Sequence, residues 1–590
     1  MPSLPILFTT KEDPNFIHEL EDRIRRIDNY SYLLEYPTVY IHYWVSSSEK
    51  YIDKNGELRD NNQYEVYVGE SNNVIERTIK HYSDGESDSN WQYHLTHAPN
   101  TPEFIVVGHK HFNKSFTLDV ENRLIEYIMS ARNLKKIHNG RGNPQNKYFP
   151  DTELIPVFKN IWRRLQKCQR DLFPPESEVL DSALFKASPL KRLSEAQLRT
   201  KDYIIDRVFS ALYNNLDGQL IFVQGEAGTG KTVLTTSTFY ELVTLSEDED
   251  LRLDCHLLVN HDQQLTVYSQ MAEKLDLGKD RVNKPSSFIH KHSSWKKVDV
   301  CLVDEGHLLL TQGNQGYSGS NQLKDIMERA RVTVVMFDEY QVLNTGEYWE
   351  DELLQSFKNI AIEQQNYFVL DYQFRMKCAE STSEWISRFV LERRIDILPQ
   401  DINGYEVKSF DSVEEMYKAI RKKAKSRDTE LSRIVATYDW DYIQNERPKD
   451  KKYWQVEIGE WSLPWNYELA KINPRQYNYG RKKLAWAEQP HTIDEVGSTF
   501  SIQGFDLSYV GVILGPSVKY REHEIVFDPS DSCNKKAKQK RSLSDGTMKS
   551  FGDLFIRNEV KVLLTRGVKG LYIFACDSGL RDALKNIAGI

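Results

Sequence analysis

The eight residues from Gly225 to Thr232, Gly-Glu-Ala-Gly-Thr-Gly-Lys-Thr, have the clearest chemical use in this chain. They follow the apolar residues 219–223, so the pattern predicts a strand, a glycine-rich turn and a helix. Glycines let consecutive backbone N–H groups point at phosphate oxygens, and a helix N-terminus adds positive potential. We predict a triphosphate-binding loop in which Lys231 neutralises the β- and γ-phosphates and Thr232 holds Mg²⁺. Its binding residues are Gly225, Glu226, Ala227, Gly228, Thr229, Gly230, Lys231 and Thr232.

Two adjacent carboxylates, Asp304 and Glu305, follow a second predicted strand over residues 298–303. We expect Asp304 to position Mg²⁺ through its water shell, and Glu305 to orient and deprotonate an attacking water. The alternative is that the two acids lie in a surface turn, where acid pairs are common. The continuous apolar strand before Asp304 favours a buried site instead. A third strand, over residues 332–337, leads to Gln341, which we expect to sense the γ-phosphate.

Three further short motifs lie next to predicted strands in the second half of the chain. Arg375 follows residues 367–370, while Gln503 and Gly504 precede residues 510–514. Arg566 comes just before a strand over residues 571–575. Each motif is weak by itself, because an ordinary loop or ion pair also produces it. Their joint order after the phosphate-binding loop is a much stronger indication.

From about residue 193 to its end, the chain resembles superfamily 1 helicases, specifically the helicase-like domain related to group 3 Schlafen proteins. The resemblance implies that Gln197 reads adenine and that Asn260 touches single-stranded nucleic acid. It also implies that Arg375 and Arg566 are arginine fingers, which stabilise charge on the phosphoryl group. Gln503 and Gly504 would couple the nucleotide to the strand. No glycine precedes Asp338 as it usually does in the family, so ATP hydrolysis is a firmer expectation than unwinding.

The first 150 residues contain a second set of side chains with chemical potential. Strands over residues 39–45 and 64–68 each contribute a tyrosine, and the predicted helix 73–82 places an arginine and a histidine on one face. The set supplies a carboxylate for a divalent metal, a cation for phosphate charge and phenols for proton transfer, as a phosphodiesterase requires. Its members are Tyr40, Tyr67, Arg77, His81, Glu121 and Asn139.

Over most of residues 37–140 this set resembles a GIY-YIG nuclease domain. The resemblance implies that Tyr40 or Tyr67 relays the water proton and that Glu121 is the single metal ligand. Valine stands where the first motif usually has glycine, and an unusually long insert, residues 46–63, separates the two tyrosine strands. The structural alternative stays open, because tyrosines are ordinary strand residues and Glu121 also suits an exposed helix surface.

Composition limits where nucleic acid can bind. The chain has 77 Lys and Arg against 86 Asp and Glu, a net charge of −9, so a local basic groove is needed. The basic run 535–541 is either a phosphate contact or a solvated loop. The six cysteines form no CxxC pair, and no apolar run reaches membrane-spanning length, so we expect a cytoplasmic protein without a membrane partner. The histidines at 94, 97, 109 and 111 lack a zinc-ligand spacing.

Strand-like runs alternate with helical periods after residue 193, which predicts parallel sheets covered by helices. The expected fold class is α/β, with a small GIY-YIG-like domain followed by two tandem RecA-like P-loop domains. The expected boundaries are 1–150 for the nuclease-like domain, 151–190 for a helical linker, and 191–395 and 396–590 for the two lobes.

These expectations combine into one function, a nucleic-acid-dependent ATPase joined to a metal-dependent endonuclease. ATP and Mg²⁺ are its predicted cofactors, and nucleic acid is its partner, with DNA preferred over RNA. The fusion of a nuclease with a nucleic-acid-dependent ATPase resembles restriction-like systems that act on foreign DNA. One alternative is an ATP-binding nucleic-acid sensor that neither cuts nor unwinds, and another is an ATP-dependent enzyme acting on small molecules. The oligomeric state stays open.

Overall fold

The computed structural model describes most of the chain, in two compact units that we treat separately. The described residues are 4–52, 58–83, 91–139, 148–248, 253–313, 316–370, 373, 375–426, 429–443, 446–466, 468–469, 486–502 and 505–587. Unit 1 comprises Met1–Ser194, Tyr240–Leu251 and Val267–Val282, and unit 2 comprises Glu195–Phe239, Arg252–Thr266 and Asn283–Ile590. No helix in the described part is long and apolar enough to cross a membrane.

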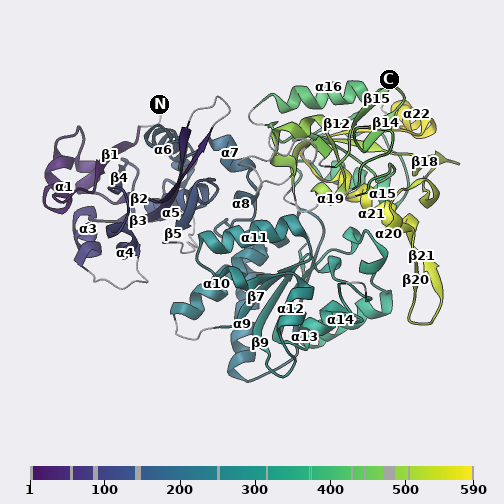
Figure 1. Cartoon of the computed structure of the whole chain (residues 1–590), viewed down its shortest axis with the longest axis horizontal. Coiled ribbons are helices and arrows are strands. Elements are labelled where there is room, and N and C mark those ends of the chain that lie inside the picture. Colours follow the sequence, from purple (N-terminus) through teal and green to yellow (C-terminus); the bar gives the residue numbers. More distant parts are fainter. Residues whose placement is uncertain are drawn as a thin grey trace. The chain divides into compact units, whose positions relative to one another are not determined.

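Unit 1 contains a five-stranded mixed sheet (Figure 1). Its order is β1 (Ile6–Lys11), β4 (Glu103–Gly108), β2 (Thr38–Ile52), β3 (Leu58–Ser71) and β5 (Leu134–Ile137). The strands predicted over residues 39–45 and 64–68 are found. The pairing of β2 with β3 continues to Ile52 and Leu58, so much of the expected insert is a long hairpin. Sequence analysis missed β1, and it missed β5 because two of its four residues are lysines.

Helices cover both faces of this sheet. Tyr40 and Tyr67 share a hydrophobic core with α1 (Phe16–Arg25), α3 (Val74–Ser83) and α4 (Trp91–Thr96). Their neighbours along the strands, Ile41 and Val66, point to the opposite face because side chains alternate, and α5 (Lys114–Met129) packs against β2 and β3. The remaining helices of the N-terminal segment are α2 (Ser31–Leu34), α6 (Leu154–Cys168), α7 (Glu176–Asp181) and α8 (Ala183–Lys186).

Unit 2 contains two separate sheets whose main strands pair in parallel. The first has the order β11 (Tyr367–Leu370), β6 (Gln219–Gly225), β10 (Ala330–Phe337), β9 (Val298–Asp304), β7 (Cys255–Val259) and β8 (Val282–Asn283). The second has the order β12 (Glu406–Ser409), β22 (Gly567–Ala575), β17 (Leu507–Leu514), β13 (Arg433–Ala436) and β16 (Val496–Gly497). The predicted α/β class with parallel sheets is confirmed. Parallel strands align their carboxyl ends along one edge, where ligands usually bind.

Helices pack around both sheets (Figure 1). The helices from residue 195 onward are α9 (Glu195–Tyr213), α10 (Lys231–Asp248), α11 (Asp262–Lys274), α12 (Pro285–Lys291), α13 (Gln322–Met327), α14 (Asp351–Glu363), α15 (Glu380–Leu391), α16 (Val413–Ala424), α19 (Thr499–Ile502), α20 (Lys535–Lys538), α21 (Gly552–Leu564) and α22 (Ser578–Ile587). The described residues also form three small ribbons: β14 (Gln455–Ile458) with β15 (Trp461–Pro464), β18 (Val518–Arg521) with β19 (Glu524–Phe527), and β20 (Lys540–Ser542) with β21 (Met548–Ser550).

The basic run 535–541 is not uniformly a solvated loop. Arg541 is only 4% exposed and donates to the Thr311 hydroxyl at 2.8 Å and to the Thr345 carbonyl at 3.0 Å. Its guanidinium lies 3.6 Å from the Glu350 carboxylate. Arg541 therefore fastens β20 to the segment before α14, whereas lysines 535, 536, 538 and 540 are exposed.

Candidate functional sites

The phosphate-binding loop joins the end of β6 to the start of α10 in unit 2. Gly228 and Gly230 have φ values of 91° and 81°, a left-handed conformation that glycine adopts at little cost. A Cβ added to Gly228 would lie 2.7 Å from the Cβ of Arg375. The glycine therefore allows both the turn and the close approach of an arginine that sequence analysis had singled out.

The ammonium of Lys231 is held inside this loop. It donates to the carbonyls of Gly225 at 2.7 Å and Glu226 at 2.9 Å, and it lies 3.4 Å from the Asp338 carboxylate. Burial raises the pKa of Asp338, but Lys231 and neighbouring hydrogen bonds outweigh it, so the pKa is lowered overall. Thr232 is the second residue of α10 and follows Lys231 at the N-terminus of the helix.

Asp304 ends β9 and is almost fully buried. Its carboxylate accepts from the Gln264 side chain at 2.9 Å and from the Glu305 backbone at 3.0 Å, and the Thr235 hydroxyl is 3.5 Å away. Carboxylate and hydroxyl oxygens are the donors that Mg²⁺ prefers, so Asp304 and Thr232 fit a hard cation. Gln264 and Thr235 were not predicted from the sequence, because neither belongs to a recognisable motif.

Glu305 is the strongest candidate for a general base. Its φ of 50° and ψ of 48° place a non-glycine residue in the left-handed region, a conformation that costs free energy and gathers at functional sites. The side chain is buried, and its Oε2 accepts no hydrogen bond in the described part of the chain. Burial raises the pKa of Glu305, although Lys231 and Arg566 oppose the shift. A carboxylate with raised pKa is suited to take a proton from water.

Gln341 and one predicted arginine finger, Arg566, meet beside Asp338, and the other, Arg375, lies near Arg566. The Gln341 amide donates to Asp338 at 2.6 Å, and Arg566 donates to the Gln341 carbonyl oxygen at 3.3 Å. Arg375 donates to Asp506 at 2.6 Å. Burial and the nearby Arg375 lower the pKa of Arg566 to about 9, so it stays protonated at neutral pH. A continuous chain of contacts thus links Lys231 to residues of the second sheet.

The residues predicted from family resemblance have mixed outcomes. Gln197 is buried, and its amide donates to the Thr229 carbonyl of the loop at 3.0 Å. Asn260 donates to the Leu308 carbonyl at 2.7 Å. Gln503 and Gly504 lie outside the described residues. The adenine-reading and strand-coupling roles therefore stay predictions.

Lys561 is a site residue that sequence analysis missed. It lies on α21, its ammonium is 3.0 Å from the Glu226 carboxylate of the loop, and it sits 3.6 Å above the Tyr340 ring. The side chain is only 7% exposed. Its position five residues before Arg566 was visible in the sequence, but its partner is 335 residues away.

The second candidate site lies in unit 1, on the α3 side of the sheet. The Tyr40 hydroxyl and the Nε2 atom of His81 are 2.9 Å apart, and the Tyr40 and Tyr67 rings are stacked. Arg77, on the same helix as His81, interacts electrostatically with the phenol groups of both tyrosines. A Cβ on Gly69 would lie 2.5 Å from the Tyr40 phenol, so this glycine makes room for the ring.

Burial sets the protonation states in this cluster. It lowers the pKa of His81 to about 3, with Arg77 adding to the shift, so the imidazole is neutral at pH 7. Burial raises the pKa of Tyr40 and of Tyr67, although Arg77 acts against it. Neutral His81 is therefore able to accept a hydrogen bond from the Tyr40 hydroxyl, but its lowered pKa makes the imidazole a weak base.

Glu121 lies on α5 next to Asn139. The Asn139 amide donates to the Glu121 carboxylate at 2.9 Å and to the Val68 carbonyl at 2.8 Å. These bonds connect the segment after β5 to α5 and β3. Glu121 also acts electrostatically on Tyr67. In the described residues no three His, Cys, Asp or Glu side chains gather as a metal site. A single-carboxylate Mg²⁺ site with water ligands is compatible with this arrangement.

Comparisons with known proteins include a family model whose match contains the phosphate-binding loop. Residues 218–577 match the family model described as "Schlafen group 3, DNA/RNA helicase domain". The Saccharomyces cerevisiae protein named "Uncharacterized protein YPL245W" is 31% identical over 474 residues, covering 73% of this chain and 98% of the relative.

Two solved helicase structures also match, at low similarity. The Pif1 helicase from Candida albicans is 14% identical with a TM-score of 0.26, and the match covers 67% of this chain and 97% of that chain. Pif1 from Bacteroides sp. is 11% identical with a TM-score of 0.20, covering 42% and 54% of the two chains.

Proposed function

Because the chain belongs to the family of Schlafen group 3 DNA/RNA helicase domains, we propose that unit 2 hydrolyses ATP when it binds nucleic acid. In this proposal Lys231 binds the β- and γ-phosphates, while Thr232 and Asp304 hold Mg²⁺. Glu305 takes the proton of the attacking water. The observation that carries the proposal is the contact chain from Lys231 through Asp338 and Gln341 to Arg566.

The same contact chain supports a coupled mechanism. Arg566 lies just before β22 of the second sheet, and Arg375, which follows β11, is tied to Asp506 just before β17; both arginines are mostly buried. Charge on a transferring phosphoryl group attracts guanidinium groups most strongly in a site of low dielectric constant. A rearrangement of the second sheet would therefore change the position of the arginines and the rate of hydrolysis together. On this basis the two sheets are the cores of two RecA-like lobes, with the boundaries given above.

For unit 1 we propose a metal-dependent endonuclease, with DNA as the preferred substrate. Arg77 binds the phosphate, and Tyr40 passes a water proton to neutral His81. The relay has to be concerted, because the raised pKa of Tyr40 disfavours a free phenolate and the lowered pKa of His81 disfavours a free imidazolium. Mg²⁺ held by Glu121 would supply positive charge for the pentavalent transition state. Asn139 orients Glu121 through its amide.

Parallel assays separate the two halves of this proposal. We expect Lys231→Ala to abolish ATP hydrolysis stimulated by single-stranded DNA, and Glu121→Gln to abolish Mg²⁺-dependent nicking of supercoiled plasmid. The matched controls are Lys422→Ala and Glu76→Gln, which change exposed residues outside both sites. Thermal unfolding checks that each variant folds.

Each half has its own refutation. If the parent protein cuts no DNA or RNA, the proposed endonuclease activity of unit 1 is refuted. ATP hydrolysis that no nucleic acid stimulates would favour the small-molecule enzyme, and ATP binding without hydrolysis would favour the sensor. A cytoplasmic location and a role against foreign DNA stay predictions.

A further inference from the structure

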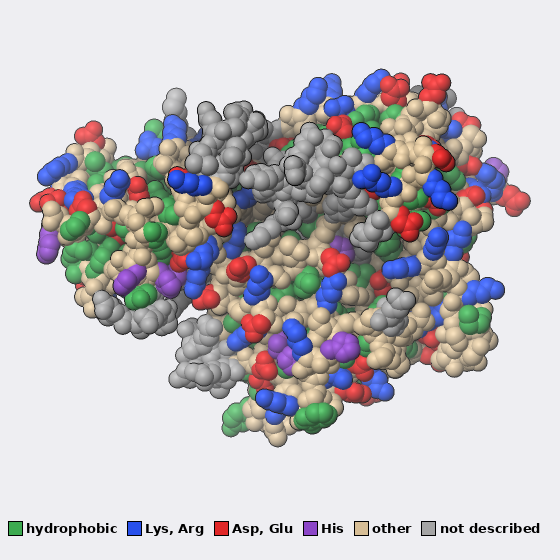
Figure 2. All heavy atoms as spheres, in the orientation of Figure 1, with side chains coloured by type: hydrophobic (Ala, Val, Ile, Leu, Met, Phe, Trp, Pro, Cys, Tyr) green, Lys and Arg blue, Asp and Glu red, His purple; other side chains and the backbone are tan. Residues whose placement is uncertain are grey.

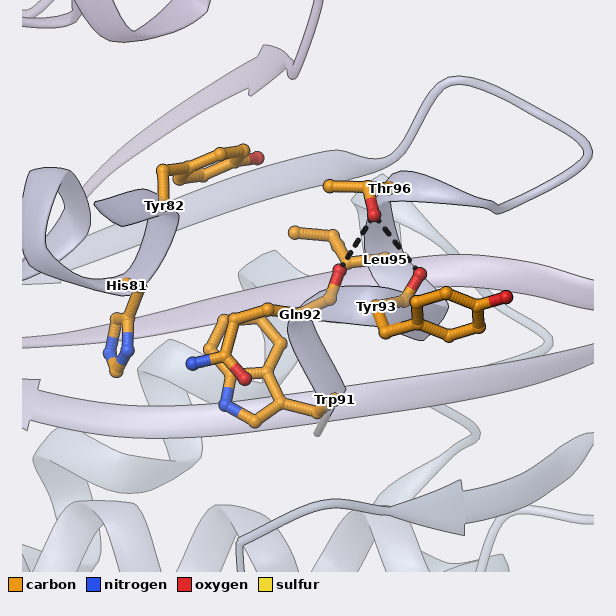
Figure 3. A pocket seen from close by; sticks show the side chains of 7 residues that line it. All are labelled: His81, Tyr82, Trp91, Gln92, Tyr93, Leu95 and Thr96. Carbon is orange, nitrogen blue, oxygen red and sulfur yellow. Dashed lines mark hydrogen bonds between the residues drawn. The ribbon is translucent and has the colours of Figure 1, made fainter. Parts of the chain in front are cut away.

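A small pocket opens beside the tyrosine cluster of unit 1 (Figure 3). Its volume is about 80 Å³, and it is lined by residues from the end of α3 and from α4. His81 belongs to both the pocket and the cluster, because its imidazole also lies 2.9 Å from the Tyr40 hydroxyl. A ligand in this pocket would therefore sit next to the proposed site of phosphodiester cleavage.

Aromatic rings form the walls of the pocket, and neighbouring contacts fix them. Trp91 stacks on Tyr67 with ring centroids 4.1 Å apart and planes 15° from parallel. The Tyr82 hydroxyl donates to the Glu12 carboxylate, and Glu12 also binds His42 at 2.9 Å. Figure 3 shows the Tyr82 ring across from Trp91. These contacts hold the rings in place before a ligand binds, which lowers the entropic cost of binding.

One polar atom in the wall has an unmet hydrogen bond. The Oε1 atom of Gln92 is buried and accepts no hydrogen bond from the described residues. A buried acceptor without a partner costs about 1–3 kcal/mol, so turning the Gln92 amide into the pocket, toward a ligand that donates, recovers this free energy. The described lining includes no Lys, Arg, Asp or Glu, and His81 is neutral, so the pocket suits an uncharged group rather than a phosphate.

A nucleobase meets these requirements. It is flat, it stacks on aromatic side chains, and stacking contributes about 1–3 kcal/mol per base. A glutamine side chain pairs best with adenine, because its carbonyl oxygen accepts from the 6-amino group while its NH₂ donates to N7. The base must also be unpaired, since a base stacked within a duplex does not reach a recessed pocket.

We propose that this pocket binds one unpaired adenine of the strand that unit 1 cuts. This inference rests on the proposed nuclease function and adds a substrate preference to it. Gln92 reads the amino group, Trp91 and Tyr82 hold the ring, and His81 connects the bound nucleotide to the Tyr40 relay. Cleavage is then favoured next to adenine in single strands or in locally opened duplex.

Removing one amino group from the substrate tests the pocket. The probe is a labelled single-stranded oligothymidylate with one central adenine, compared with the same strand carrying purine, which lacks the 6-amino group. Binding is measured by fluorescence polarisation with the Glu121→Gln variant, and the rate and position of cleavage with the parent protein. The hydrogen bond predicts about 5–150-fold preference for adenine, from about 1–3 kcal/mol of discrimination.

Gln92→Ala should reduce this preference to less than about twofold, because the acceptor is gone. Tyr36→Ala, which removes a half-exposed tyrosine of the same unit outside the pocket, should leave it unchanged. Equal affinity for the two strands in the parent, or an unchanged preference in Gln92→Ala, would overturn the inference. If nothing is cut but the preference in binding persists and depends on Gln92, the nuclease function fails and the adenine pocket stands.

Discussion

The contact between Lys561 and Glu226 gives the sharpest test of how the two sheets of unit 2 cooperate. Lys561 belongs to α21, which ends two residues before Arg566, and Glu226 belongs to the phosphate-binding loop. The ammonium also lies over the Tyr340 ring. Replacing Lys561 with methionine keeps most of the side-chain volume and removes the charge. We expect the contact between α21 and the phosphate-binding loop to weaken, and Arg566 to be less firmly positioned as a result.

The size of the effect follows from the geometry. Two unit charges 3.0 Å apart attract by about 5 kcal/mol at an effective dielectric constant of about 20. The Glu226 side chain is 55% exposed, so solvent screening reduces this to about 1 kcal/mol. The contact with Tyr340 adds about 1 kcal/mol. A total of about 2 kcal/mol corresponds to about 30-fold in rate if the contact is formed only in the transition state.

The assay is steady-state ATP hydrolysis at saturating single-stranded DNA, with kcat and KM measured separately. A lower kcat at unchanged KM would show that the contact acts in the transition state. Glu226→Gln and the double variant complete a mutant cycle, in which the two effects should be less than additive. Lys422→Met is the matched exposed control. Turnover of Lys561→Met within about twofold of the parent, or strictly additive effects, would refute the reasoning.

Two further predictions concern stability and the unit 1 site. Burial and the nearby Asp439 raise the pKa of Glu559 from 4.5 to about 8, so this carboxyl is protonated when folded and ionised when unfolded. Folded stability should fall as pH rises from about 4.5 to about 8, by about 3 kcal/mol at pH 7, and Glu559→Gln should remove that loss. A difference in Tm between variant and parent that does not grow over this pH range would contradict it. Gly69→Ala should displace the Tyr40 phenol and slow plasmid nicking at least about tenfold while ATP hydrolysis is unchanged, and normal nicking would show that the ring position is unimportant.

Much of the fold was predictable because its signals are local. Long apolar runs such as those of β6, β9 and β10 are fully buried parallel strands, and their composition alone distinguishes them from the helices between them. The short strands β5, β12 and β16 were missed, since two to four residues carry too little pattern. Their extended conformation depends on the neighbouring strand that pairs with them.

The length of the β2–β3 hairpin illustrates the same limit. Residues 46–63 are mostly polar, so the sequence indicated an insert between two strands. In the structure the ladder continues through much of this stretch, because the backbone hydrogen bonds of one strand satisfy those of the other whatever the side chains are.

The sequence by itself determined the chemistry that depends on neighbouring residues. The order Gly225 to Thr232 dictates a phosphate-binding loop because its glycine spacing, lysine and hydroxyl act together over one turn. Asp304 and Glu305 are adjacent, so their place at the end of a strand was also readable from the chain.

Only the tertiary structure decided which distant groups meet. It paired Glu226 with Lys561, and it brought Gln92 and Tyr82 to one pocket beside His81. These contacts depend on how helices pack on a sheet, and spacing along the chain does not encode that packing. Burial, which raises the pKa of Glu305 and lowers that of His81, likewise arises only when the surrounding side chains exclude water.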